Sequence, residues 1–260
     1  MLTINTRNYK KLEYLVAGTG RCGTVFFAQL LTSMGIPCGH EHIFNIQNKK
    51  ICFERLIDPL KRTNSLCSET SFLSEDYENK FVDVTKTIAE SSYFLVPYLN
   101  ENYLKGIPLL HVTRHPFKVI RSFVEDFNYF KNPEDYDDIY IKQYESFLYK
   151  NYPELLLYSN PYDRAAQYYI SCNEKLFEQK EKRSYLSIKI EEIKKNKKII
   201  EKFFKKRFPK ELPIHRNSRI KCEIKEIDFT YFENDELKIK LKSIMEFLKY
   251  SDQPHFSQDT

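Results

Sequence analysis

Residues 12–35 read LEYLVAGTGRCGTVFFAQLLTSMG, and this stretch predicts a strand, a glycine-rich turn and a helix. Residues 12–17 form a short apolar run typical of a buried strand. Apolar side chains at positions 27, 30, 31 and 34 then follow the spacing of one helix face, and Gly35 stands where a helix commonly ends. Because a helix that starts after a strand presents free N–H groups, the arrangement favours an anion site. A tight turn that binds nothing is the alternative.

The glycines concentrate in this region. The chain has six, and five of them lie between positions 18 and 39. Glycine is needed where φ is positive or where a backbone approaches another group closely. We therefore expect most of the special backbone geometry of the chain to lie in this segment.

The glycine turn lacks the residues of an ATP- or GTP-binding P-loop. Gly18 and Gly23 have the P-loop spacing, but Thr24 and Val25 follow where such a loop has Lys and then Ser or Thr. The only cation within the turn is Arg21. The anion is expected to be held by backbone N–H groups and this arginine, without a metal.

A dinucleotide-binding turn is a second alternative, because residues 18–23 also match G-x-G-x-x-G. That motif needs an acidic residue about 20 positions further on, at the end of a second strand. Glu41 has the right distance, but we expect it to follow a helix and a Pro-Cys-Gly turn rather than a strand. The sequence therefore argues against a dinucleotide site.

A second apolar run, residues 107–113, predicts another strand, and Arg114 follows it directly. Pro116 suits the first position of a helix, and the apolar stripe of that helix runs through Val119, Ile120, Phe123, Val124 and Phe127. Ser122 lies about 130° away from this stripe at 100° per residue, so packing does not explain it. Ligands of open parallel sheets bind at the carboxyl ends of the strands, where Arg114 and Ser122 could converge on one anion.

The two segments together resemble the sulfotransferases that use 3′-phosphoadenosine 5′-phosphosulfate. Residues 19–25 (TGRCGTV) resemble the family's PRSGTT turn, and Arg114, Pro116 and Ser122 match its R-x-P-x(5)-S motif. Weaker similarities lie at residues 89–99, as in bacterial glycan-type members, at 184–193 and at 215–219, so that the resemblance extends from about residue 12 to 250. It implies a donor bound at the 5′-phosphosulfate by the first motif and at the 3′-phosphate by the second.

The resemblance assigns roles to individual residues. The expected donor-binding residues are Thr19, Gly20, Arg21, Cys22, Gly23, Thr24, Val25, Arg114, Ser122 and Arg219. Two of them depart from the family pattern: Cys22 stands where Ser is usual, and Val25 replaces the second Thr, which removes one hydroxyl contact to the 5′-phosphate. Arg21 replaces the lysine of cytosolic relatives, as in many bacterial ones, and is also expected to act in catalysis, by stabilising charge on the leaving phosphate.

A general base is expected in the segment His40-Glu41-His42 after the first helix. Bacterial relatives carry a catalytic Glu at this place, so Glu41 is the predicted base, although the sequence leaves all three residues open. A zinc site built from His40, His42, Cys38 and Cys52 is disfavoured, because these residues lack the spacing of a structural zinc site. Glu90, Ser91 and Ser92 are interpreted as a helix start.

The remaining chain predicts a single domain over residues 1–260. Residues 45–80 look polar and irregular, with a possible strand at 81–84, and residues 129–180 form a tyrosine-rich helical insertion interrupted by Pro133, Pro153 and Pro161. Residues 191–207 read as a basic amphipathic helix with a solvated face, and 235–250 as a last helix. Helix packing explains the tyrosines better than sugar stacking.

Composition narrows the function. The 260 residues carry 41 basic and 36 acidic side chains, a net charge of only +5, and 42% hydrophobic residues. We therefore expect a folded protein without a nucleic-acid partner, and the absence of a long apolar run argues against a membrane span. Six cysteines without a CxxC pair and no apolar leader favour a reduced, cytoplasmic protein.

The sequence thus predicts a three-layer α/β fold of the P-loop type, with a small parallel sheet of four or five strands and helices on both faces. The predicted activity is sulfuryl transfer from 3′-phosphoadenosine 5′-phosphosulfate to a hydroxyl of a carbohydrate, glycolipid or small metabolite. A nucleotide or small-molecule kinase and an inactive nucleotide-binding module are the alternatives. The acceptor, O- against N-sulfation, the aromatic residue that stacks on adenine and the oligomeric state are left open.

Overall fold

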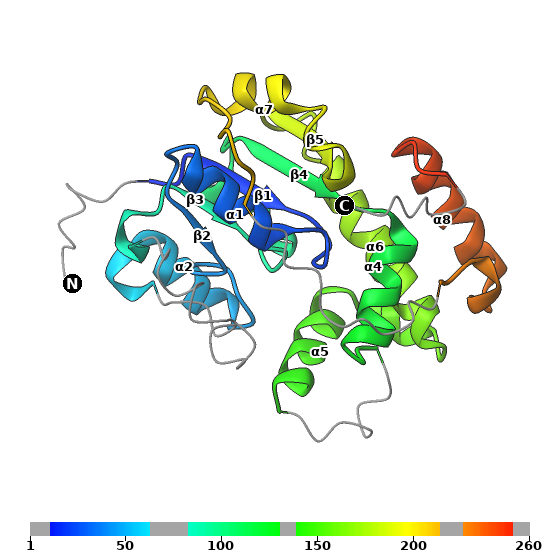
Figure 1. Cartoon of the computed structure of the whole chain (residues 1–260). Helices are drawn as coiled ribbons and strands as arrows, with labels where there is room; N and C mark the ends of the chain where they lie inside the picture. Colours follow the sequence, from blue (N-terminus) through cyan, green and yellow to red (C-terminus); the bar gives the residue numbers. More distant parts are fainter. Residues whose placement is uncertain (1–10, 63–82, 131–138, 214–225, 252–260) are drawn as a thin grey trace.

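The computed structural model describes residues 11–62, 83–130, 139–213 and 226–251. Its centre is a five-stranded parallel sheet in the order β2-β3-β1-β4-β5 (Figure 1). The strands are β1 (Tyr14–Ala17), β2 (Cys38–His40), β3 (Ala89–Ser91), β4 (Leu109–Thr113) and β5 (Tyr185–Lys189). The predicted α/β class and the small parallel sheet are confirmed.

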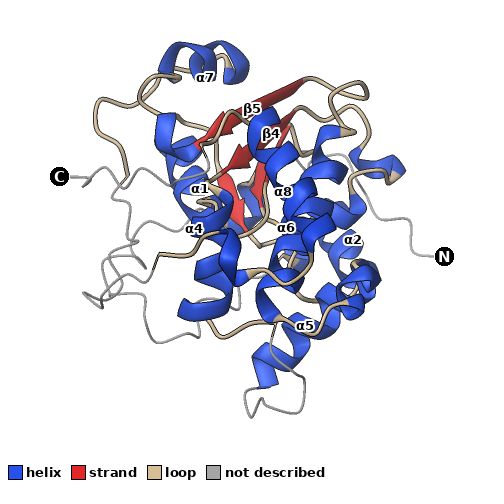
Figure 2. Cartoon of the chain, turned by 90° about the vertical axis from the view of Figure 1, so that its right-hand side faces the viewer, coloured by secondary structure: helices blue, strands red, loops and turns tan. Residues whose placement is uncertain are grey.

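Helices cover both faces of this sheet. They are α1 (Thr24–Ser33), α2 (Lys49–Ile57), α4 (Pro116–Arg121), α5 (Ile139–Asn151), α6 (Pro161–Phe177), α7 (Lys197–Phe204) and α8 (Asp235–Phe247). A π-helical turn (Ser122–Asp126) continues α4, and a 3-10 turn (Pro153–Leu157) joins α5 to α6. The strands, red in Figure 2, lie inside this helical shell.

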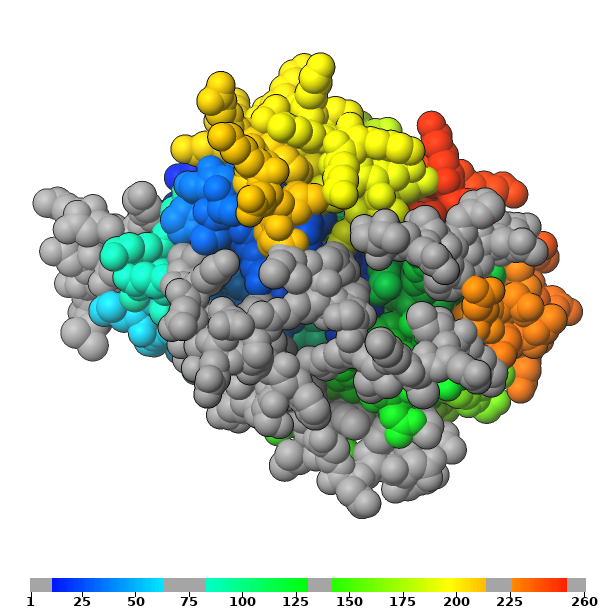
Figure 3. Space-filling model, viewed as in Figure 1, coloured from blue at the N-terminus to red at the C-terminus, as the bar shows by residue number. Residues whose placement is uncertain are grey.

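Two cores form on opposite faces because side chains alternate along a strand. Leu15 and Ala17 of β1 point into the larger core with the side chains of α2, α5, α6 and α8. Val16 points into the smaller core, which contains the buried faces of α1 and α7. In the space-filling view the yellow surface around α7 borders the blue surface of α1 (Figure 3). The result is the predicted three-layer arrangement.

The tyrosines of the predicted insertion serve packing. Tyr144, Tyr152, Tyr168 and Tyr169 are at most 1% exposed, and the rings of Tyr152 and Tyr168 meet edge to face with centroids 5.1 Å apart. Pro153 and Pro161 begin helical elements, as proline at a first helical position should.

Several local predictions are wrong. Glu90 and Ser91, interpreted together with Ser92 as a helix start, lie in strand β3, and Glu41 follows strand β2 rather than a bare turn. Residues 49–57, expected to be irregular, form α2, which begins behind an Asn48 side chain that accepts the N–H of Ile51. The helix expected over 191–207 is shorter, because residues 190–192 form a 3-10 turn and α7 spans only Lys197–Phe204. The strand expected at 81–84 is not formed in its described part, where Val84–Lys86 is a 3-10 turn.

The strand order still excludes the dinucleotide alternative. In dinucleotide-binding folds, the strand that ends in the acidic residue lies directly beside the first strand. Here β3 separates β2 from β1, and β2 is an outer strand. Glu41 therefore ends a strand, yet it does not lie where a ribose of that ligand would.

Candidate functional site

The glycine turn joins β1 to α1 at the carboxyl edge of the sheet, and it is tightly packed. A Cβ on Gly18 would lie 2.3 Å from Cys22 Sγ and 2.4 Å from the Val112 carbonyl oxygen. Gly20 and Gly23 have φ values of +76° and +100°, which L side chains rarely adopt. The glycines are therefore required by the path of this turn.

The N-terminus of α1 has the free groups that an anion site needs. Gly23 occupies the N-cap position without any side-chain cap, and the first turn contains no acidic residue. The first N–H groups of a helix have no partner within the helix, and they carry the positive end of its dipole. Among the described residues, no side chain caps this end, and a ligand oxygen could take that place.

Arg21 extends from the same turn to the helix after β4. Its Nε donates to Ser122 Oγ at 3.1 Å, and its guanidinium carbon lies 3.8 Å from the centre of the Phe127 ring. Arg21 itself has φ of 52°. The residue assigned to the 5′ end of the donor therefore contacts the serine assigned to the 3′ end.

Arg114 links the two segments a second time. Its Nη1 donates to the Arg21 carbonyl oxygen at 2.9 Å, and Tyr169 OH donates to the Arg114 carbonyl oxygen at 3.0 Å. Burial lowers the pKa of the Arg114 guanidinium, while Glu191 opposes that shift. The two predicted motifs, far apart along the chain, thus meet at one place on the sheet edge.

The other predicted donor-binding residues that the structure describes lie in the turn and in the first turn of α1. Thr19 Oγ1 donates to the Gly20 carbonyl oxygen at 3.0 Å, and Thr24 Oγ1 lies 3.2 Å from His40 Nε2. Val25 is 38% exposed in the first turn of α1. Cys22 is fully buried, and burial raises the pKa of its thiol to about 11, so that it stays protonated. A buried, protonated thiol is a poor nucleophile, and the backbone role of Cys22 stays a prediction.

The segment His40-Glu41-His42 lies beside this turn, at the end of β2. Glu41 is 2% exposed, has φ of 60°, and its Oε1 is 3.6 Å from His40 Nε2. Burial lowers the pKa of His40 to about 3 and that of His42 to about 4, so that both rings are neutral near pH 7. Neither histidine is therefore a good proton acceptor at that pH.

Tyr144 is a site residue that the sequence does not single out. It is fully buried on α5 with its ring stacked on Tyr129, the centroids 4.4 Å apart. Burial raises the pKa of its hydroxyl well above the ordinary value, the nearby Tyr129 and Glu41 add to this shift, and Arg21 opposes it. The charges of the two predicted catalytic side chains, Glu41 and Arg21, thus shift this pKa in opposite directions. The sequence signal is only the density of tyrosines after residue 129.

Tyr93 is a second such residue, and it flanks the turn directly. A Cβ on Gly20 would lie 3.2 Å from the Tyr93 ring and 3.3 Å from the Phe123 ring. Aromatic rings therefore line the glycine turn beside Arg21. In sequence, Tyr93 follows the serine pair that we interpreted as a helix start, and nothing there predicts its position.

One predicted donor-binding residue lies outside the described residues. Arg219, predicted to bind the donor, falls among residues 214–225 and is not described. Within the described ranges, no three His, Cys, Asp or Glu side chains come together as a metal site would require. The same residues include no helix that combines the length and apolarity of a membrane span.

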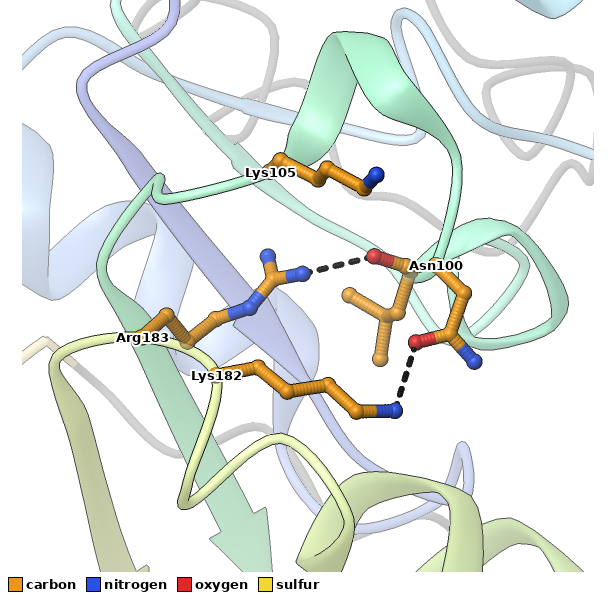
Figure 4. Close-up of a pocket in the computed structure, with 5 residues that line it drawn as sticks. Asn100, Lys105, Lys182 and Arg183 are labelled. Atoms are coloured by element: carbon orange, nitrogen blue, oxygen red, sulfur yellow. Dashed lines mark hydrogen bonds between the residues drawn. The ribbon is translucent and has the colours of Figure 1, made fainter.

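A small pocket at the amino ends of β4 and β5 lies away from this site. Leu99, Asn100, Lys105, Lys182 and Arg183 line it (Figure 4). Arg183 Nη2 donates to the Leu99 carbonyl oxygen at 2.6 Å, and Lys182 Nζ donates to Asn100 Oδ1 at 3.0 Å. These cations serve loop structure, and the pocket lies at the opposite edge from the two motifs.

The buried titratable groups predict acid sensitivity. His40, His42 and His111 have pKa values lowered by burial to about 3, 4 and 3, while burial raises that of Glu90 to about 7. Between pH 5 and 7 the unfolded chain binds more protons at each histidine than the folded chain does, and fewer at the glutamate. Each histidine then adds about 2 kcal/mol to the free energy of unfolding over this interval and Glu90 removes about 2, for a net rise of about 4 kcal/mol.

Urea unfolding at the two pH values measures this rise. The His111→Phe variant, which lacks one titrating ring, should show a difference between the pH values that is smaller by about 2 kcal/mol. A free energy of unfolding that stays constant or decreases from pH 5 to 7 would contradict the prediction.

Comparison with known proteins gives a likeness at the level of structure. No protein-family model and no curated protein matches the chain. Among solved structures, it is similar to the sulfotransferase domain of the olefin synthase of Synechococcus PCC 7002, at 13% identity and a TM-score of 0.48. The match covers 97% of this chain and 99% of that domain.

Proposed function

We propose that this protein is a sulfotransferase that moves a sulfuryl group from 3′-phosphoadenosine 5′-phosphosulfate to a hydroxyl of a carbohydrate, glycolipid or small metabolite. The observation that carries the proposal is the meeting of the two motifs, in which Arg21, Arg114 and Ser122 form one hydrogen-bonded group beside an uncapped helix N-terminus. A donor with anionic groups at both ends requires two cationic segments at one site.

The donor-binding roles are those that the resemblance implies, and this geometry supports them. The N–H groups at the start of α1 and Arg21 would bind the 5′-phosphosulfate, and Arg114 and Ser122 would bind the 3′-phosphate. Arg21 Nε donates to Ser122 Oγ, and the Ser122 O–H can still donate to a phosphate oxygen. Phosphate and sulfate oxygens accept hydrogen bonds from guanidinium more strongly than a neutral hydroxyl does.

The chemical step needs a proton acceptor and charge stabilisation. The bond between sulfur and the bridging oxygen of the 5′-phosphate breaks, a bond to the acceptor oxygen forms, and the acceptor proton passes to a base. Glu41 is proposed as that base, because its two histidine neighbours have pKa values of about 3 and 4. Arg21 would stabilise the charge that develops on the leaving adenosine 3′,5′-bisphosphate.

Thermal shift with nucleotides tests the donor. Adenosine 3′,5′-bisphosphate should raise the melting temperature by several degrees at about 100 times its Kd, since binding then adds about 2.7 kcal/mol. AMP, ADP and ATP, which lack the 3′-phosphate, should shift it less. The Arg114→Ala variant should lose this preference and Ser122→Ala should weaken it, whereas the exposed Arg207→Ala control keeps it.

Two outcomes would count against the proposal. A bisphosphate preference that survives Arg114→Ala would show that this arginine does not bind the 3′-phosphate. A larger shift with ATP that requires Mg²⁺, together with transfer activity lost in EDTA, would favour the kinase alternative. The exposed Val25, which leaves the helix start without a second hydroxyl, favours the inactive nucleotide-binding module as the other candidate. That candidate predicts the same bisphosphate shift without sulfation of any acceptor.

A further inference from the structure

Glu90 is a buried carboxylate that lies next to the turn containing Glu41, and the proposed reaction assigns it no role. It occupies the middle of β3 and is 0% exposed. Its Oε1 accepts the backbone N–H groups of Ile43 at 2.8 Å and Phe44 at 3.1 Å. One carboxylate oxygen thus holds two consecutive amides of the segment that follows Glu41.

Residues adjacent to Glu90 hold the same turn from the strand end. The Glu41 N–H donates to the Ser91 carbonyl oxygen at 3.3 Å. Ser92 Oγ donates to the Phe44 carbonyl oxygen at 2.7 Å. Residues 90–92 therefore all form hydrogen bonds with residues 41–44, and of these three residues only Glu90 does so with an ionisable group.

The second carboxylate oxygen lies in a confined, polar place. A Cβ on Gly39 would be 2.6 Å from Glu90 Oε2 and 2.8 Å from His42 Nδ1. Neither of these two buried atoms has a hydrogen-bond partner among the described residues. Oε2 is therefore not fixed by an ion pair there, and the proton of a neutral carboxyl group could reside on it.

The groups that face Glu90 come from three elements. Arg55 of α2 and Arg62, after the 3-10 turn that follows α2, favour its charged form, while His42 beside it is neutral near pH 7. Cys38 of β2 and Cys52 of α2 also face it, and burial raises the pKa of both thiols, so that neither carries charge at that pH. Burial outweighs the two arginines and the two N–H groups, and the pKa of Glu90 is raised to about 7.

We propose that Glu90 is the positioning residue for Glu41: its carboxylate fixes the 41–44 turn, and protonation of that carboxylate loosens the turn. Hydrogen bonds from N–H to a charged oxygen are about twice as strong as those to a neutral one. Glu41 is held at a positive φ, which is unfavourable for a residue with a side chain, so the turn depends on such support. The catalytic consequence rests on the proposed function, but the structural one does not.

Hydrogen exchange of the Ile43 and Phe44 amides tests the structural claim without any substrate. After correction for intrinsic exchange, protection in the wild-type protein should rise several-fold as pH increases from 6 to 8.5. The Glu90→Gln variant keeps the shape and an accepting oxygen but cannot ionise, so its protection should be lower above pH 7 and independent of pH. Wild-type protection that does not change with pH would overturn the proposal. If the variant does not fold, the pH dependence of the wild-type protection is sufficient to test the proposal.

Glu145→Gln is the matched control. Glu145 is 2% exposed, and its Oε1 accepts the Phe130 N–H at 2.8 Å, a similar bond outside the 41–44 turn. This variant should leave the pH dependence of the Ile43 and Phe44 amides as in the wild type. A change equal to that of Glu90→Gln would show general loosening and overturn the specific role of Glu90.

A second readout addresses the reaction. In the wild type, kcat should fall as pH decreases through about 7, and Glu90→Gln should have a low kcat without this limb. Affinity for adenosine 3′,5′-bisphosphate should be unchanged in this variant, because Glu90 contacts no predicted donor-binding residue in its two hydrogen bonds. If no transfer is found while the amide protection still titrates, the proposed function fails and the role of Glu90 in the turn stands.

Discussion

The Gly18→Ala variant is expected to lose at least about 3 kcal/mol of its free energy of unfolding, the upper range for overpacking a filled site. The new methyl group would lie 2.4 Å from the Val112 carbonyl oxygen, which belongs to strand β4 and cannot turn aside. It would also lie 2.3 Å from Cys22 Sγ. Relief requires β1 and β4 to separate locally, which disturbs the centre of the sheet. Urea denaturation measures the loss, which should be accompanied by a lower yield of folded protein.

Gly35→Ala provides the control for this variant. Gly35 has φ of +80°, and nothing lies within 4 Å of an added Cβ. Alanine there meets backbone strain alone, about 1–2 kcal/mol. Equal losses in the two variants would show that crowding at Gly18 is not the cause. Adding Cys22→Ala to Gly18→Ala should not restore stability, because the contact with the backbone oxygen persists.

Glu41→Gln is expected to reduce the rate of sulfuryl transfer by about 10²–10⁴-fold, the usual contribution of a general base. Glutamine preserves the size of the side chain but cannot accept the acceptor proton. Binding of adenosine 3′,5′-bisphosphate should change little, because Glu41 is not assigned to the donor. The measurement is transfer of labelled sulfate from the donor to a panel of hydroxyl acceptors, with the nucleotide affinity determined in parallel.

His40→Gln distinguishes the base from its neighbour. The ring of His40 is neutral near pH 7 and contacts Thr24. The transfer rate of this variant should therefore stay within about tenfold of the wild-type rate, a smaller loss than that expected for a base. A rate within a few-fold of wild type for Glu41→Gln would remove Glu41 from the mechanism. A large loss for His40→Gln alone would assign the base to the histidine.

The parts of the fold that could be predicted are those with a strong local signal. Strands β1 and β4 are apolar runs, and α1 and α4 carry apolar stripes between a glycine or proline start and a defined end. Strands β2 and β3 were missed because each has three residues and contains polar ones, Cys-Gly-His and Ala-Glu-Ser. Their burial comes from pairing in the sheet, and no periodicity in three residues can indicate it.

The candidate site divides in the same way. Arg114 and Ser122 were predicted to converge at a strand end, and the family resemblance added Arg21 at the other end of the same donor. The structure places the three residues in contact. Tyr144 and Tyr93 lie at the site because elements that are distant in the sequence pack together there. The spacing of residues in the sequence does not predict such packing. Glu90 shows the limit most clearly: in sequence it was interpreted as part of a helix start, whereas it accepts amides 47 and 46 residues away.

The left-handed backbone at both Arg21 and Glu41 has a consequence for selection. Glycine at either position would remove the steric penalty of a positive φ. A search for stabilising substitutions would therefore favour glycine at the two positions that the proposed chemistry most needs. In a library sorted only for heat resistance, substitutions at these two positions would be the first to remove activity. A variant that gains stability there would show that the fold does not require the original side chain.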